Sequence, residues 1–259
     1  VVGGGVAGME VARIATLRGH QVTLFEKKKV LGGNLIPGGS HTFKKEVREL
    51  NAWYQQELDT LNVTVETGTE VTADWLKQMN ADIIVLAVGA TPVVPKVRGI
   101  ENPMVMTSLE ALEHAEKVGK KVVVIGGGLV GCEMALEYAQ EGKEVTIVEA
   151  LDAILSASIP SPIPNRQMLH DLFEHHNVNI LTGHKLAAVK DGKVVLETEA
   201  GSKEIDTDSV VLAVGFKPVK SMVSELRDSK AVIYEIGDGR QIGTIMKAIW
   251  DGYEIANNI

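Results

Sequence analysis

The chain has 259 residues, of which 45% are hydrophobic and 4% aromatic, with one cysteine and a formal net charge of −8. This length allows one or two domains, and an acidic, aromatic-poor chain without a basic stripe argues against nucleic-acid binding. No apolar run approaches the ~20 residues that cross a bilayer, and a lone cysteine excludes an internal disulfide or a CxxC pair. We therefore expect a cytoplasmic protein with neither a membrane nor a nucleic acid as partner.

The first predicted element is a glycine turn that joins a strand to a helix. Residues 3–8 read GGGVAG, which fits GxGxxG, and a helix is expected over residues 9–18. In a Rossmann unit the first glycine permits the turn, the second lets the backbone approach a pyrophosphate, and the third lets helix and strand pack closely. A strand over residues 21–25 then leads to Glu26, an acid suited to ribose hydroxyls.

Only Val1 and Val2 precede this turn. A Rossmann strand needs about five or six residues, so we expect the first strand to be truncated and further sequence to lie upstream.

The remainder of the first half is expected to complete a Rossmann-like unit. The pattern predicts a helix over residues 43–61, strands over residues 63–66 and 69–71, and a buried strand that ends in AVGATP at residues 87–92. Pro92 to Met106 is expected to be a linker.

The same pattern returns 123 residues later. Residues 126–131 read GGGLVG, after an apolar strand over residues 121–125 and before a predicted helix over residues 132–141. A strand over residues 144–148 leads to Glu149, and the distance from the first glycine to the acid is 23 residues in both copies. Two such patterns with strand, helix and acid in place indicate two bound nucleotides, which suits electron transfer between cofactors.

The second copy continues as the first does and is followed by a closing segment. The pattern predicts a helix over residues 165–176 and strands over residues 178–181, 186–190 and 194–199, with Asp191-Gly192 as a hairpin turn. An apolar run then ends in AVGFKP at residues 213–218. A short strand over residues 231–236 and a final helix over residues 244–258 complete the prediction.

These motifs resemble the two-dinucleotide-binding flavoproteins of the pyridine-nucleotide–disulfide-reductase superfamily. The matching pieces are both glycine turns with their acids, both AVGxxP runs and the late Ile236-Gly237-Asp238. Leu31-Gly32-Gly33-Asn34 and the ending around Gly237 to Gly252 are most similar to the C-terminal half of the old-yellow-enzyme-related NADH:flavin oxidoreductases, such as 2-enoate reductases and 2,4-dienoyl-CoA reductase.

The resemblance implies an α/β fold of two Rossmann-like, three-layer ββα domains, the second inserted in the first. Residues 1–105 and 218–259 would form the FAD-binding domain, and residues 106–217 the NADH-binding domain. FAD contacts would come from Gly3, Gly5, Val6, Ala7, Gly8, Glu26, Lys27, Gly32, Gly33, Asn34, Val71, Ala87, Val88, Gly89, Gly237, Asp238, Gly243, Thr244 and Ile245. NADH contacts would come from Gly126, Gly128, Leu129, Val130, Gly131, Glu149, Ala213, Val214 and Gly215.

Glu149 favours NADH over NADPH. A carboxylate at this position suits a free ribose 2′-hydroxyl and repels a 2′-phosphate, and no arginine among residues 150–155 compensates for it.

The resemblance implies hydride transfer from NADH to FAD, chemistry that the cofactors supply and the protein orients. No catalytic side chain or metal ligand is expected in this chain, and the lack of CxxC argues against a disulfide reductase. Electrons would pass to FMN and an iron–sulfur cluster in an upstream barrel domain that reduces an activated C=C bond. Two alternatives stay open: a structural module that binds only ADP, and a free-standing NADH oxidase or ferredoxin reductase. A homo-oligomer is possible in each case.

Overall fold

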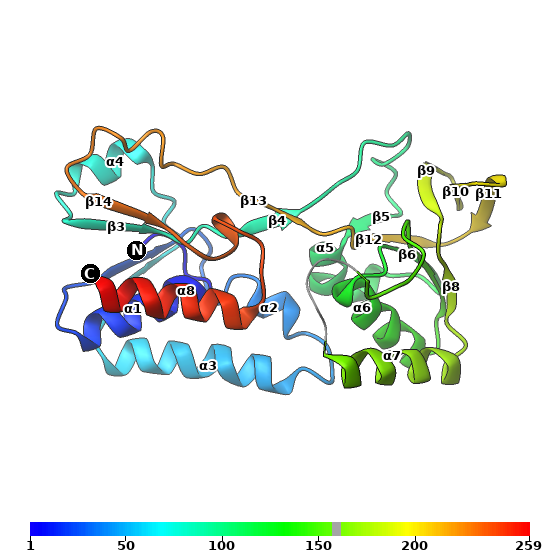
Figure 1. The fold of residues 1–259 in the computed structure, drawn as a ribbon, viewed down its shortest axis with the longest axis horizontal. Coiled ribbons are helices and arrows are strands. Elements are labelled where there is room, and N and C mark those ends of the chain that lie inside the picture. Colours follow the sequence, from blue (N-terminus) through cyan, green and yellow to red (C-terminus); the bar gives the residue numbers. More distant parts are fainter. Residues whose placement is uncertain (157–161) are drawn as a thin grey trace. The chain divides into compact units, whose positions relative to one another are not determined.

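The structure, a computed structural model, describes residues 1–156 and 162–259 and divides the chain into two compact units (Figure 1). Unit 1 comprises Val1–Thr91 and Lys217–Ile259, and unit 2 comprises Pro92–Phe216. Unit 2 is therefore inserted in unit 1, as expected. At the two chain crossings, β4 (Ala90–Pro92) pairs with β13 (Phe216–Pro218).

Residues 92–105, which we expected to be a linker at the end of the first domain, belong to unit 2. These residues belong to unit 2 because they pair with its strands. β5 (Val105–Thr107) pairs with β12 (Ser209–Leu212), and Arg98 forms an isolated β-bridge with Ala188.

Unit 1 is built on a parallel sheet around the two valines at the start of the chain. On one side β1 (Thr23–Glu26) pairs with β2 (Thr64–Thr67), and on the other β3 (Ile83–Leu86) pairs with β14 (Val232–Glu235). Val2 bridges both Phe25 and Leu86, so the short first strand lies in the middle of the sheet. Its position places the glycine turn at the carboxyl end of the sheet, where nucleotides bind in such folds.

Helices cover one face of this sheet: α1 (Val6–Leu17), α3 (Lys45–Thr60) and α8 (Ile245–Asn258), with the short α2 (Leu35–Gly38) leading into α3 (Figure 1). Small residues let α1 and α8 approach closely. A Cβ built on Gly252 would lie 2.7 Å from the carbonyl oxygen of Ala7, and Ala248 and Ala256 are buried beside Val11 and Ala15. Any larger side chain at Gly252 would push α8 away from the glycine turn.

The other face of the sheet in unit 1 departs from prediction. The strand expected at residues 69–71 is wrong, because these residues pair with no strand in the described part of the chain. α4 (Ala73–Gln78) follows instead, and the Thr72 side chain caps it by accepting the Trp75 N–H. Val71, Leu76 and Leu226 pack on Phe25 and Leu86, so α4 and the segment around Leu226 form the covering layer.

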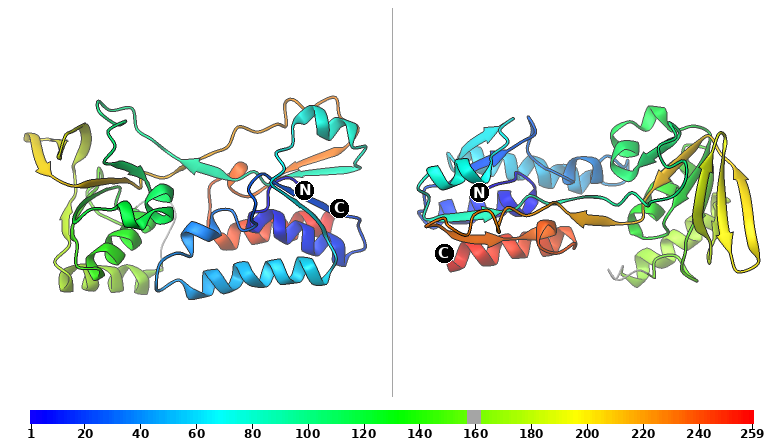
Figure 2. Two further views of the ribbon diagram at one scale, coloured as in Figure 1. Left: turned by 180° about the vertical axis from the view of Figure 1, so that it is seen from behind. Right: turned by 90° about the horizontal axis from the view of Figure 1, so that it is seen from above.

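Unit 2 has the full three-layer arrangement (Figure 2). Its parallel sheet has the order β5-β12-β6-β7-β8, with β6 (Lys121–Ile125), β7 (Glu144–Val148) and β8 (Asn179–Leu181). α5 (Ser108–Glu113), α6 (Leu129–Gln140) and α7 (Ile163–His175) cover one face; β9 (Lys185–Lys190), β10 (Lys193–Thr198) and β11 (Gly201–Asp206) form an antiparallel layer on the other. Along β6, Val122 and Val124 face the helices while Val123 and Ile125 face the antiparallel layer.

The Rossmann-like fold class expected from the sequence is confirmed. β11, α4 and α5 are additions that the sequence analysis missed. None of the helices in the described residues has the length and apolar character needed to span a bilayer.

Candidate functional site

The glycine turn of unit 1 divides into packed positions and one open position. Gly3 has φ +105°, and a Cβ built on it would lie 2.3 Å from the Ala87 carbonyl oxygen. A Cβ on Gly8 would lie 1.9 Å from the Gly3 carbonyl oxygen, so both positions exclude any side chain. A Cβ on Gly5 meets nothing within 4 Å, and Gly5 is the N-cap of α1.

Unit 2 repeats this geometry. Gly126 has φ +111° and its added Cβ would lie 2.4 Å from the Ala213 carbonyl oxygen, while that of Gly131 would lie 2.0 Å from Gly126. Gly128 is the N-cap of α6 and again faces open space. The free N–H groups of a helix N-terminus attract a phosphate, so each turn offers a cradle that a side chain would fill and a pyrophosphate fits.

The two acids are held by backbone donors in the same way. Glu26 is buried, and its carboxylate accepts N–H bonds from Gly4 at 2.7 Å and from Lys28 at 2.7 Å. Glu149 accepts N–H bonds from Gly127 at 2.6 Å and from Leu151 at 2.8 Å. Each carboxylate oxygen takes one of these bonds and keeps lone pairs for ribose hydroxyls. These charge-assisted bonds to backbone N–H groups fix the orientation of both carboxylates.

The loops that follow the acids differ between the units. In unit 1 the Gly32 N–H donates to the Gly4 carbonyl oxygen, and Gly33, at φ +52°, lies so close that its added Cβ would be 3.0 Å from the Gly5 Cα. In unit 2 the Leu155 N–H makes the equivalent bond to Gly127, with Leu155 itself left-handed at φ +56°. The Gly33 approach therefore gives the first cradle a wall from its own loop.

Asp238 follows β14 at the end of the unit 1 sheet. Gly237 has φ +61° and turns the chain, and the Asp238 carboxylate accepts the Gly243 N–H at 2.9 Å. Burial raises the pKa of Asp238 above its ordinary value of 3.8, although the Gly243 bond and the Lys247 charge oppose this shift. A half-buried carboxylate at this place suits a hydroxyl donor.

The other predicted residues lie around these features. Thr244 caps α8 by accepting the Lys247 N–H, and Asn34 is the N-cap of α2 with no side-chain capping bond. Gly89 and Gly215, at φ +73° and +101°, face open space. The remaining predicted residues differ in exposure. Three are buried: Ala7, Val71 and Ala87. Four are half-buried: Val6, Val88, Ala213 and Gly243. Five are exposed: Lys27, Leu129, Val130, Val214 and Ile245.

Three structural contributors escaped the sequence analysis. Gly4 and Gly127 donate to the acids and leave no room for a side chain, because an added Cβ would lie 2.4 Å from Leu31 and 2.6 Å from Ile154, respectively. The uninterrupted GGG in each turn was the available signal. Asp251 accepts the Gly237 N–H at 3.2 Å and the Lys247 ammonium at 2.7 Å, which anchors the turn before Asp238; its i, i+4 spacing from Lys247 was readable.

Cys132 lies beside the second cradle yet is fully buried, and its thiol donates to the Gly127 carbonyl oxygen at 3.4 Å. Burial raises the pKa of Cys132 to about 12. The thiol is therefore part of the packed core and not a reactive group.

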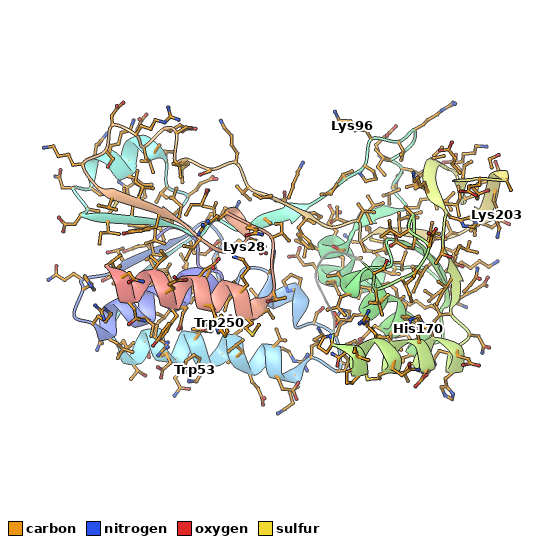
Figure 3. All side chains as sticks on the ribbon, viewed as in Figure 1. Lys28, Trp53, Lys96, His170, Lys203 and Trp250 are labelled. Atoms are coloured by element: carbon orange, nitrogen blue, oxygen red, sulfur yellow. The ribbon has the colours of Figure 1, made fainter. Side chains whose placement is uncertain are left out.

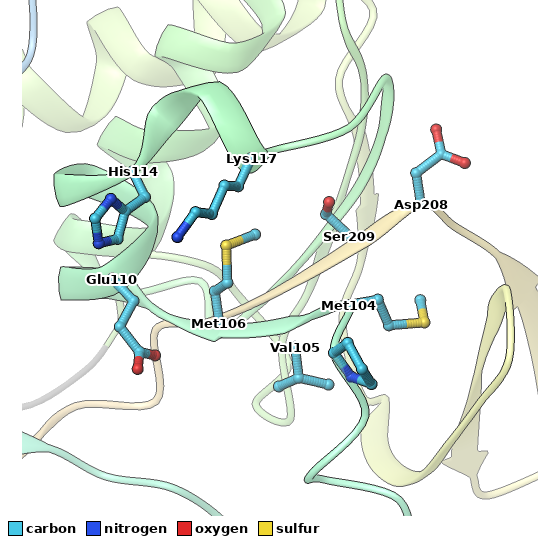
Figure 4. A pocket seen from close by; sticks show the side chains of 9 residues that line it. Met104, Val105, Met106, Glu110, His114, Lys117, Asp208 and Ser209 are labelled. Carbon is cyan, nitrogen blue, oxygen red and sulfur yellow. The ribbon is translucent and has the colours of Figure 1, made fainter.

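A separate hollow of about 430 Å³ in unit 2 contains none of the predicted site residues (Figure 4). Its lining residues are Pro103, Met104, Val105, Met106, Glu110, His114, Lys117, Asp208 and Ser209. Much of its polar wall is engaged internally: Glu110 completes the capping box of α5, the Ser209 hydroxyl accepts the Gly119 N–H, and Asp208 accepts two backbone N–H bonds.

Two Rossmann-like units with matching cradles and acids define a protein built to hold two nucleotides. A family model described as pyridine nucleotide-disulphide oxidoreductase matches residues 1–252, and the chain belongs to this family. The resemblance expected from the sequence is confirmed, as is the class of enzyme, an oxidoreductase of a family that uses FAD and a pyridine nucleotide.

Within this family, the chain is similar to several reductases. Cinnamate reductase of Clostridium sporogenes is 40% identical over 100% of this chain and 39% of its own length. Bilirubin reductase of Mediterraneibacter gnavus is 36% identical over 99% of this chain and 40% of its own length. A solved complex of 2-naphthoyl-CoA reductase with 2-naphthoyl-CoA matches with a TM-score of 0.90 and 33% identity, over 100% of this chain and 39% of that one. The chain thus spans about two fifths of these relatives.

Proposed function

We propose that the chain is the FAD- and NADH-binding module of a longer flavoprotein reductase. Unit 1 would hold FAD and unit 2 would hold NADH. The observation that supports this most directly is the matched pair of cradles. Within the two GxGxxG turns only Gly5 and Gly128 face open space, and each acid is oriented by two backbone N–H groups.

The assignment of FAD to unit 1 rests on two features of that unit. The Gly33 backbone lies close to Gly5, and Asp238 offers a half-buried carboxylate after β14. A cradle that is bordered by Gly33 and supplemented by the Asp238 carboxylate suits a cofactor that stays bound. The cradle of unit 2 would then serve a nucleotide that enters and leaves at each turnover. Glu149, with no arginine among residues 150–155, favours NADH.

The contribution of this chain to the reaction is binding and orientation. Bound FAD would supply a redox centre able to accept a hydride from NADH. The helix N-termini of α1 and α6 would neutralise the pyrophosphates, Glu26 and Glu149 would accept ribose hydroxyl bonds, and Asp238 would anchor a ribitol hydroxyl. This step needs no general acid or base from the chain, because the cofactors carry the chemistry.

The whole protein would relay electrons to an upstream barrel domain carrying FMN and an iron–sulfur cluster, and there reduce an activated C=C bond. The names and lengths of cinnamate reductase and 2-naphthoyl-CoA reductase support this proposal, because the chain matches about two fifths of each. We assign the predicted site residues to FAD and NADH on the same basis.

An anaerobic titration tests the proposal. The purified chain is reconstituted with FAD, freed of excess cofactor, and mixed with NADH or NADPH while flavin absorbance is followed. We expect one bound FAD whose absorbance bleaches faster with NADH. Binding of ADP without FAD would instead establish the structural-module alternative, and rapid turnover of the chain alone with oxygen would establish the NADH oxidase alternative.

A further inference from the structure

α8 carries apolar side chains on two opposite faces. Its inner face packs against α1 through Ala248, Gly252 and Ala256. Its outer face carries three large apolar side chains with 60%, 66% and 52% of their surface exposed: Met246, Trp250 and Tyr253. Their spacing of i, i+4 and i+7 places them in one row along the helix, which we name the α8 stripe; Trp250 is labelled on α8 in Figure 3.

Two of the three charged residues of α8 lie away from the stripe, and the third, Glu254, is exposed to solvent. Lys247 and Asp251 pair with each other at 2.7 Å, and Asp251 also accepts the Gly237 N–H, so both lie toward the Asp238 turn. Their side chains are only 35% and 17% exposed. Surface helices normally put polar side chains outward, whereas a helix that is apolar on both faces is covered on both. The α8 stripe therefore has the composition of a covered face.

We propose that the α8 stripe is the docking surface for the additional domain that the long relatives carry, within the same polypeptide. This inference rests on the proposed function. Cinnamate reductase, bilirubin reductase and 2-naphthoyl-CoA reductase each hold about three fifths of their length outside the match to this chain, which is ample for such a domain.

The position of the stripe fits this occupant. α8 starts directly after Gly243, whose N–H binds Asp238, so Met246 lies within a helical turn of the proposed FAD site. Electrons that leave FAD for another domain need a short path. A domain seated on the stripe would meet that need, because its surface would begin beside the flavin end of unit 1.

Thiol labelling tests the proposal on the long polypeptide. Trp250→Cys is compared with Ile163→Cys, whose position on α7 is 73% exposed and outside the proposed sites. Cys132 provides little background within this chain, because its thiol is buried. Both proteins are treated with a maleimide in their native state, and labelling of each site is quantified by peptide mass. We expect labelling at Trp250→Cys to be at least tenfold slower than at Ile163→Cys, and the two rates to become equal after denaturation.

Equal labelling rates at the two sites in the native protein would overturn the proposal. So would the finding that the gene encodes only this chain and that Trp250→Cys in it is labelled freely. Protection that appears only at high protein concentration would assign the stripe to a second copy of the chain and overturn it too. FAD content is measured on the same samples. Protection without FAD would keep the docking surface and remove the proposed function, while FAD without protection would do the reverse.

Discussion

Gly128 and Gly131 lie three residues apart, yet an added methyl group should affect them in opposite ways. Gly131→Ala places a Cβ 2.0 Å from the Gly126 carbonyl oxygen, so we expect unfolding free energy to fall by about 1–3 kcal/mol. Gly128→Ala meets no protein atom within 4 Å, so stability should be unchanged while NADH affinity falls about tenfold. Chemical denaturation and NADH titration separate the two effects; equal loss of stability in both variants would contradict the cradle.

Glu149 should control the choice of nicotinamide nucleotide. Replacing Glu149 by Ala and Ala150 by Arg removes the repulsion of a 2′-phosphate and supplies a bidentate donor. We expect the preference to move toward NADPH by roughly 100-fold, or about 2.7 kcal/mol, measured as the ratio of flavin reduction rates at limiting nucleotide. Arg introduced at exposed Asp152 alone, with Glu149 kept, is the control and should move the ratio much less.

Asp238 should make stability depend on pH. Because burial raises its pKa in the folded chain, the folded state binds the proton more tightly, so this residue's favourable contribution is present below pH 3.8 and is lost as pH rises through the folded-state pKa. Asp238→Asn keeps an acceptor for the Gly243 N–H and removes the charge. Without FAD, we expect the variant to melt higher than the native chain at pH 7 and equally at pH 3.8 or below; a melting difference that is constant with pH would contradict this.

At the scale of elements, Asp251 links α8 to the turn that precedes Asp238 in the proposed FAD site. Asp251→Ala leaves the Gly237 N–H and the Lys247 ammonium without their acceptor, which should cost about 1–3 kcal/mol of stability. It should also lower FAD affinity, because the turn before Asp238 loosens. Glu254→Ala, an exposed position on the same helix, should change neither quantity. Melting temperature and FAD fluorescence titration check both variants.

Long amphipathic or apolar elements were predictable, and short ones were often missed. α1, α3, α6 and α8 lie within a few residues of their predictions because apolar periodicity and glycine stops mark them. β11 reads GSKEID and has one large apolar residue, so its strand conformation comes from pairing with β10 rather than from its own pattern. α5 did carry a legible signal, the Thr107–Glu110 capping box.

At the scale of the whole molecule, the unlike cradles predict unlike retention of the two nucleotides. Gly33 walls the cradle of unit 1, and Asp238 adds an anchor, so FAD should survive repeated gel filtration that removes NADH completely. We expect dissociation rates that differ by about tenfold or more, measured by stopped-flow displacement. Comparable rates for the two nucleotides would contradict the assignment of the walled cradle to FAD.

The sequence could predict the glycines and acids of both units because spacing alone identifies them. The sequence could not show which residues pack against Gly3 and Gly126, because Ala87 and Ala213 lie far along the chain from each turn. The division between units was displaced for the same reason: only the three-dimensional pairing of β5 with β12 assigns residues 92–105. Non-local contacts of this kind leave no periodic trace along the chain.

The backbone bonds to Glu26 and Glu149 have a practical consequence. Both acids take their orientation from main-chain N–H groups of Gly4, Lys28, Gly127 and Leu151. Side chains at positions 27–29 and 150–152 can therefore change, through evolution or engineering, while each carboxylate keeps its orientation. A duplicated module of this kind can acquire new nucleotide preferences in one copy without disturbing the other.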